Sequence, residues 1–153
     1  MDNIDLQEYL KEAGIRAEIL DMKGRVHSVA EASSELGLPP RNFIKTMVFT
    51  GSEGKPILAI VRGTDRASPT RIGRLLGIDP PPLATPDEVL KLTEYEVGGT
   101  PPISIQGARV LVDTKVMEQD EVVGGGGSER HLLRISPEEI LRATDGEVLR
   151  IRD

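Results

Sequence analysis

Two apolar segments joined by a glycine-containing loop constrain the fold of this chain more than any other feature. Residues 43–50 (FIKTMVFT) and 56–61 (PILAIV) have the composition of strands, and residues 51–54 (GSEG) lie between them. Such a loop between two such runs predicts a β-hairpin, whose strands are antiparallel. Five further strands are expected, interspersed with helices, so we expect an α/β (α+β) fold with helices around a mixed sheet. These further strands are residues 16–20, 109–113, 121–123, 132–135 and 147–151.

The expected helices begin at recognisable capping residues. Ser28 stands three residues before Glu31, and Thr85 stands three residues before Glu88, which is the spacing of a capping box. Two more helices are expected to start where a serine precedes a proline, at residues 68–69 and 136–137. Proline suits the first helical position. With the apolar stripe in residues 5–13, these signals predict five helices.

Length and composition limit the classes of protein. The chain has 153 residues, and we expect residues 1–153 to form a single domain. Cysteine is absent, which excludes disulfides, thiolate zinc sites and a cysteine nucleophile. The two histidines, His27 and His131, are far apart and lack metal-ligand spacing. We therefore expect no metal site and no cofactor.

The charge and the apolar runs limit the partners. The formal net charge is −6, whereas proteins that bind a long duplex through its phosphates are usually basic. Any contact with nucleic acid should therefore be small and local, and we do not expect DNA as a partner. No apolar run is long enough to span a bilayer, and no signal peptide is recognised. We expect a cytoplasmic protein without a membrane partner.

Lys45 interrupts an apolar strand face. Period-two alternation places it on the same face as Phe43, Met47 and Phe49, where a charge is costly. One interpretation is an edge-strand lysine whose stem packs while its ammonium reaches water. The other is a cation at the lip of a cleft, where it binds a phosphate or a carboxylate. The pattern alone does not choose between them.

In the segment Gly98-Gly99-Thr100-Pro101-Pro102, glycines and prolines decide the backbone conformation, and we expect a loop. Two glycines permit positive φ angles and close approach of a ligand, and two prolines stiffen the exit. Carbonyl groups and the N–H groups of Gly99 and Thr100 could orient a water molecule or stabilise an oxyanion. A sharp chain reversal without a ligand is the alternative.

The run Gly124–Gly127, followed by Ser128, suits a backbone nest for an anion. It lacks the Gly-Lys-Ser/Thr of a nucleotide-binding P-loop. A flexible linker is the alternative, but it would leave only residues 129–153 beyond it, too few for a core. We therefore expect a loop inside one domain.

A basic stretch supplies further cations for an anion site. A solvated helix face is the commoner explanation for such a stretch, and a local phosphate-binding patch is the functional one. The arginines are Arg62, Arg66, Arg71 and Arg74.

The motifs follow one another in a characteristic order. A helix with the sequence SVAEA leads into LGLPP and is followed by FIKTMVF, and VGGTPP, the glycine turn and HLLRISPEEIL come later in the chain. This order resembles the YbaK/prolyl-tRNA-synthetase-associated family of aminoacyl-tRNA editing domains, including its stand-alone members. The resemblance covers residues 26–143.

The resemblance implies a barrel-like mixed sheet and a trans-acting hydrolase. Members of the family hydrolyse the ester that joins a wrong amino acid to the 3′ end of a tRNA. The implied substrate is Ala, Cys, Ser or Thr on tRNA(Pro) or a related tRNA, attacked by a backbone-positioned water. The implied partner is the acceptor end of mischarged aminoacyl-tRNA, and an aminoacyl-tRNA synthetase is admitted as a second partner.

The resemblance also implies roles for individual residues. Lys45 would engage the acceptor end, and the loop would place the ester carbonyl and the water. The implied catalytic residues are Lys45, Gly98, Gly99, Thr100 and Pro102, and the implied substrate-binding residues are His27, Thr46, Pro101, Gly125, Gly126, Gly127 and Ser128. Two alternatives stay open. One is a non-catalytic module that binds an acceptor end, a nucleotide or a synthetase, and the other is a phosphate-ligand binder that uses the glycines.

Overall fold

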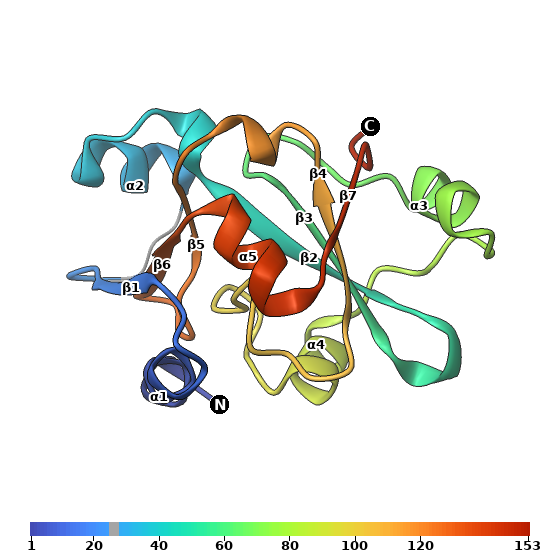
Figure 1. Cartoon of the computed structure of the whole chain (residues 1–153), viewed down its shortest axis with the longest axis horizontal. Helices are drawn as coiled ribbons and strands as arrows, with labels where there is room; N and C mark the ends of the chain where they lie inside the picture. Colours follow the sequence, from blue (N-terminus) through green and yellow to red (C-terminus); the bar gives the residue numbers. More distant parts are fainter. Residues whose placement is uncertain (25–27) are drawn as a thin grey trace.

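The computed structural model describes residues 1–24 and 28–153, and Figure 1 shows how its elements are arranged. The helices and strands fall close to the expected positions. The helices are α1 (Asn3–Ala13), α2 (Val29–Leu36), α3 (Pro69–Leu76), α4 (Pro86–Thr93) and α5 (Pro137–Thr144). The strands are β1 (Ala17–Asp21), β2 (Ile44–Thr50), β3 (Pro56–Arg62), β4 (Arg109–Asp113), β5 (Val122–Gly125), β6 (His131–Ile135) and β7 (Glu147–Leu149).

The expected helix starts are confirmed by their capping hydrogen bonds. The side chain of Ser28 accepts a hydrogen bond from the N–H of Glu31, and Thr85 and Glu88 form a complete capping box. Ser68 and Ser136 cap α3 and α5 in the same way. None of the helices in the described ranges is long and apolar enough to cross a membrane.

The strands form two sheets, as Figure 1 shows. One has the order β2-β3-β4-β7, in which β2 and β3 are the expected antiparallel hairpin and the other pairs are parallel. The other is antiparallel with the order β1-β6-β5. The mixed α/β fold is thus confirmed, but the described strands do not close into one barrel. Among the described residues, the two sheets are joined by one parallel bridge, between Phe43 and Val123.

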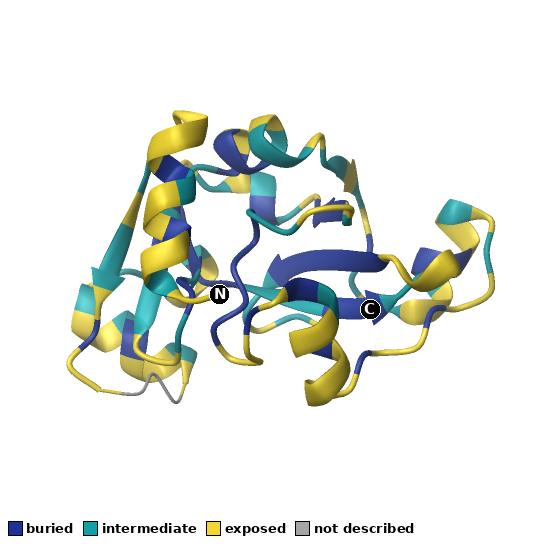
Figure 2. Cartoon of the chain, turned by 90° about the horizontal axis from the view of Figure 1, so that it is seen from below, coloured by how far each residue is buried: buried dark blue, intermediate teal, exposed yellow. Residues whose placement is uncertain are grey.

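Both faces of the hairpin are buried. Ile44 and Val48 of β2 pack in the larger core with Leu58 and Ile60 of β3. Phe49 packs in the second core cluster, on the opposite face. Figure 2 shows buried strands at the centre of the molecule and exposed outer faces on the helices. β2 therefore has a core cluster packed against each of its faces, although it is the edge strand of its sheet.

Asp113, at the end of β4, is fully buried and holds the C-terminal segment. Its carboxylate accepts hydrogen bonds from the N–H groups of Lys115 (3.0 Å), Ile151 (2.9 Å) and Arg152 (3.2 Å). The Arg152 guanidinium donates another at 2.9 Å. Burial alone would raise the pKa of Asp113, but these hydrogen bonds together lower it.

The anchored C-terminal segment in turn supports residues 66–68. The N–H of Ser68 donates to the carbonyl of Ile151 (2.7 Å), and the N–H of Asp153 donates to the carbonyl of Arg66 (2.9 Å). The position of the Arg66 backbone therefore depends on contacts with residues more than eighty positions away in sequence.

We predict that Asp113→Asn lowers the free energy of unfolding by about 3 kcal/mol, because it leaves Arg152 and the N–H groups facing an uncharged side chain. Urea unfolding measures this difference. The exposed Asp79 is the matched control, and Asp79→Asn should change stability by less than about 0.5 kcal/mol.

The difference in the free energy of unfolding between wild type and Asp113→Asn should depend on pH. The pKa of Asp113 is lower in the folded than in the unfolded chain, so its contribution is complete above the unfolded value, about pH 4, and is lost as pH falls through the folded value. The gap between wild type and Asp113→Asn should therefore narrow in acid. A gap that stays constant as the pH is lowered would contradict this role of Asp113.

Candidate active site

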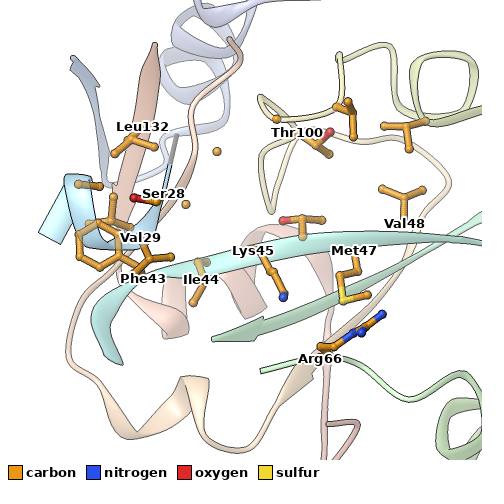
Figure 3. Close-up of a pocket in the computed structure, with 18 of the residues that line it drawn as sticks. Ser28, Val29, Phe43, Ile44, Lys45, Met47, Val48, Arg66, Thr100 and Leu132 are labelled. Atoms are coloured by element: carbon orange, nitrogen blue, oxygen red, sulfur yellow. The ribbon is translucent and has the colours of Figure 1, made fainter. Parts of the chain in front are cut away.

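A pocket of about 630 Å³ lies along the free edge of β2. It receives residues from α2, β2, β5 and the segments 83–89 and 97–100. Figure 3 shows Lys45 and Met47 on one side of β2 and Val48 and Thr100 on the other. The pocket therefore reaches around the strand edge and has two unlike halves.

The first half carries two cations. Lys45 is half-buried, and the exposed Arg66 also lines the pocket, from the segment after β3. Figure 3 shows both side chains on the same side of β2 as Met47. Within the described residues, neither side chain forms an ion pair or a hydrogen bond, which leaves both free to bind an anion.

The pKa of Lys45 reflects this environment. Burial lowers it, and the nearby positive charge of Arg66 lowers it further, whereas Asp65 acts weakly in the opposite direction. Asp65 is itself engaged by Arg62, whose Nε lies 2.8 Å from the carboxylate. An anion between Lys45 and Arg66 would relieve the repulsion between the two cations.

The second half is mostly apolar. Val48, Ala84 and Val89 belong to the larger core cluster and form its inner wall. Leu83 and Val97 form its rim, and each is 54% exposed. A small aliphatic group would be desolvated here without losing any hydrogen bond.

The loop of residues 98–102 forms one wall of the apolar half. Thr100 is buried and lines the pocket together with Gly98, whose φ of 91° favours glycine. The N–H of Gly99 donates to the carbonyl of Glu96 at 3.0 Å, and the Thr100 hydroxyl donates to the same carbonyl at 3.2 Å. The expectation that the Gly99 N–H could face a ligand is therefore wrong, because this internal hydrogen bond uses it.

The glycine turn packs directly behind that loop. Gly125 belongs to β5, and a Cβ there would lie 2.2 Å from the carbonyl oxygen of Thr100. A Cβ on Gly99 would lie 2.8 Å from the Ser128 backbone. Real side chains essentially never approach so closely, so these glycines allow two backbone segments to touch.

The glycine N–H groups argue against an anion nest at the end of the run. The N–H of Gly126 donates to the carbonyl of His131 (3.0 Å), and the N–H of Gly127 donates to the carbonyl of Gly99 (2.8 Å). The Ser128 hydroxyl lies 2.6 Å from Nδ1 of His131 and closes the turn. These groups hold the loop in place instead of facing a ligand.

The structure brings together part of the predicted site. Lys45, Thr46, Gly98, Thr100 and Gly125 line the pocket. The other predicted residues that the structure describes do not line it, and Gly99, Gly126, Gly127 and Ser128 form the packed layer behind it. Pro101 and Pro102 are buried next to Thr100, and Pro102 lines a second cavity of about 360 Å³. His27 lies outside the described residues.

The sequence predicted Ser28 as a helix cap but not as a pocket residue, and it did not predict the apolar wall or separate Arg66 from its neighbouring arginines. Of the four arginines in the basic stretch, only Arg66 lines the pocket. The one sequence signal for the wall was Leu83, an apolar residue that directly follows three prolines. Its bridge to Phe49 of β2 is a long-range contact, which the sequence does not reveal.

The chemistry available in the pocket is limited. Among the described residues that line it there is no Asp, Glu or His. The described parts of the chain also contain no group of three or more His, Asp or Glu side chains that could hold a metal ion. The pocket thus offers cations, the hydroxyl groups of Ser28, Thr46 and Thr100, backbone groups and an apolar wall.

Relatives of this chain are found among known proteins. Residues 23–143 match the family model of the aminoacyl-tRNA editing domain. The proline–tRNA ligase of Nitratidesulfovibrio vulgaris is 34% identical over 112 residues, 72% of this chain and 19% of the ligase. That of Streptococcus thermophilus is 25% identical over 128 residues, 82% of this chain and 20% of the ligase. The chain thus spans only 19% to 20% of the length of these relatives.

Two solved structures share the fold along almost the whole chain. One, of a protein proposed as a trans-editing enzyme for prolyl-tRNA synthetase, has a TM-score of 0.90 at 28% identity and covers 99% of this chain and 96% of that one. Another, of a hypothetical protein, has a TM-score of 0.88 at 32% identity and covers 97% of this chain and 99% of that one. With the family match over residues 23–143, these findings show that the chain belongs to the aminoacyl-tRNA editing domain family.

Proposed function

We propose that this chain is a trans-acting deacylase that hydrolyses the ester of mischarged aminoacyl-tRNA. The observation that supports this most strongly is the convergence of Lys45 and the Gly98–Thr100 loop on one pocket, in a member of the editing-domain family. The acceptor end of the tRNA would enter the pocket. The cytoplasm, where tRNA is aminoacylated, would be its place of action.

The two halves of the pocket fit the two ends of such a substrate. Lys45 and Arg66 would bind a phosphate near the 3′ end, because both are unpaired cations on one side of β2. The apolar half would take the amino-acid side chain. This local pair of cations would allow a chain of net charge −6 to bind tRNA through a small contact.

Hydrolysis would proceed without a side-chain general base. An aminoacyl ester is already activated, so a correctly placed water suffices if the developing oxyanion is stabilised. Backbone groups of Gly98 and Thr100 would place that water, and the hydroxyl of the terminal ribose would assist. The lack of Asp, Glu and His among the described lining residues favours this route.

The amino acid would be small. Val48, Ala84 and Val89 belong to the packed core, so the inner wall would not easily move back to admit a large side chain. We propose Ala, Cys, Ser or Thr on tRNA(Pro) or a related tRNA, in keeping with the similarity to proline–tRNA ligases. Size discriminates weakly between such side chains, and a synthetase that delivers the tRNA would add selectivity.

We predict that the wild-type chain deacylates at least one of the Ala, Cys, Ser and Thr esters of tRNA(Pro), and that Lys45→Ala lowers this rate about 100-fold by removing a phosphate-binding cation. The measurement is the loss of labelled amino acid from purified aminoacyl-tRNA. The matched control is Lys55→Ala, an exposed lysine in the β2–β3 loop.

Thermal unfolding of the same variants shows whether Lys45 acts in the reaction or only stabilises the fold. If Lys45→Ala lowers stability but leaves deacylation per folded molecule unchanged, Lys45 has no part in the reaction. If the folded wild type hydrolyses none of the esters, the chain is a binding module for an acceptor end, a nucleotide or a synthetase, and the proposal is wrong.

The affinity for an uncharged ACCA oligonucleotide should depend on the protonation of Lys45. Because burial and Arg66 lower the pKa of Lys45, affinity should fall as pH rises through this lowered value, before an ordinary lysine would lose its proton. Arg66→Met removes the neighbouring charge and should move the midpoint to higher pH while weakening binding. Fluorescence anisotropy over a pH series measures both effects, and a midpoint unaffected by Arg66→Met would contradict the coupling.

A further inference from the structure

β2 has a stretch of free edge inside the pocket. Phe43 forms a bridge with Val123, and Phe49 forms a bridge with Leu83. Between these two points, no described strand pairs with β2 on the side away from β3. Thr46 lies in the middle of this stretch and lines the pocket.

The backbone of Thr46 is directed toward this free edge. The N–H of Ala84 donates to the carbonyl of Val48 (2.9 Å), and the N–H of Thr50 donates to the carbonyl of Pro82 (2.9 Å), both on the side away from β3. Along an antiparallel strand, the backbone groups of successive residues point alternately to either side. The N–H and the carbonyl of Thr46 therefore point the same way as those of Val48 and Thr50, into the pocket.

A residue in this position exchanges two hydrogen bonds with an antiparallel partner. The aminoacyl group of an ester has the same two groups in the same order as an amino-acid residue in a strand, an N–H donor and a carbonyl acceptor. We propose that Thr46 recognises the substrate through its backbone. Its carbonyl accepts a hydrogen bond from the α-ammonium group, and its N–H donates to the ester carbonyl oxygen.

This inference rests on the proposed function, and the pocket supports the direction of binding. In an antiparallel pair, the ester side of the substrate runs toward the N-terminal end of β2, where Lys45 precedes Thr46. Directly opposite residues place their side chains on the same face, so an L-amino acid would enter the apolar half with Val48. A D-amino acid would instead point toward Lys45 and Met47.

The pairing would also explain recognition of any aminoacyl ester irrespective of its side chain. The ammonium-to-carbonyl contact is charge-assisted, and the N–H of Thr46 polarises the carbonyl that water attacks. The backbone of β2 would thus select an α-amino ester, while the apolar wall selects its size.

The test compares an aminoacyl-tRNA that the wild type hydrolyses with the matching ester that lacks the α-amino group, such as propionyl-tRNA for alanyl-tRNA. Each enzymatic rate is divided by the spontaneous rate of the same ester, because the ammonium group also activates the free ester. We expect the acceleration to be about 10- to 100-fold smaller for the ester without the amino group.

Variants of Thr46 test whether its backbone groups cause the preference for the ester with the α-amino group. Thr46 lies opposite Ile60 of β3, but its N–H points away from β3. Thr46→Pro removes this N–H without removing a hydrogen bond to β3 and should lower the acceleration of the amino ester. Thr46→Val retains both backbone groups and should retain the preference for the amino ester. The two-ester comparison is made on the wild type and does not depend on how the variants fold.

Equal acceleration of the two esters by the wild type would overturn the inference while leaving the deacylase proposal intact. If no aminoacyl ester is hydrolysed at all, the proposed function fails, and the inference fails with it.

Discussion

The candidate site can form because β2 lies at the edge of its sheet. A strand inside the sheet would have both backbone edges occupied, whereas in the described part of the chain the outer edge of β2 is paired only near Phe43 and Phe49. Period-two alternation then places Lys45 on one side of the free edge and Val48 on the other. One extended segment thereby supplies a cation, an apolar wall and unpaired backbone groups to the same pocket.

Close backbone packing fixes the opposite wall of the pocket. The loop at residues 98–102 cannot move toward or away from the glycine turn without breaking the contact at Gly125 or the hydrogen bond from Gly127 to Gly99. A site that relies on backbone groups needs such rigidity, because a backbone group has no rotamer with which to adjust its position. The glycines therefore serve the geometry of the loop more than they serve direct contact with a ligand.

Local signals in the sequence predicted the elements well. The caps at Ser28 and Thr85, the hairpin at residues 43–61 and the alternation through Lys45 depend on neighbours within a few residues, and the structure confirms each of them. The resemblance to editing domains supplied the order of the segments and led to the correct family.

What the sequence could not predict depends on long-range contacts. Arg66 lines the pocket because the C-terminal residues held by Asp113 support its backbone, and nothing near Arg66 in sequence reveals that. The internal hydrogen bond of the Gly99 N–H and the division of the strands into two sheets are likewise consequences of packing. Local patterns thus identify the segments of the site, and only the fold shows which atoms face the ligand.

We propose that the edge of β2 and the loop at residues 98–100 bind the aminoacylated 3′ end together. The most direct measurement is a backbone amide NMR titration with a non-hydrolysable 3′-alanylamido-adenosine 5′-phosphate. We expect chemical-shift changes concentrated at residues 44–48 and 98–100 and at Arg66, with little change around the cavity at Ile103 and Ala108. Shifts confined to another surface, or none at saturating ligand, would contradict it.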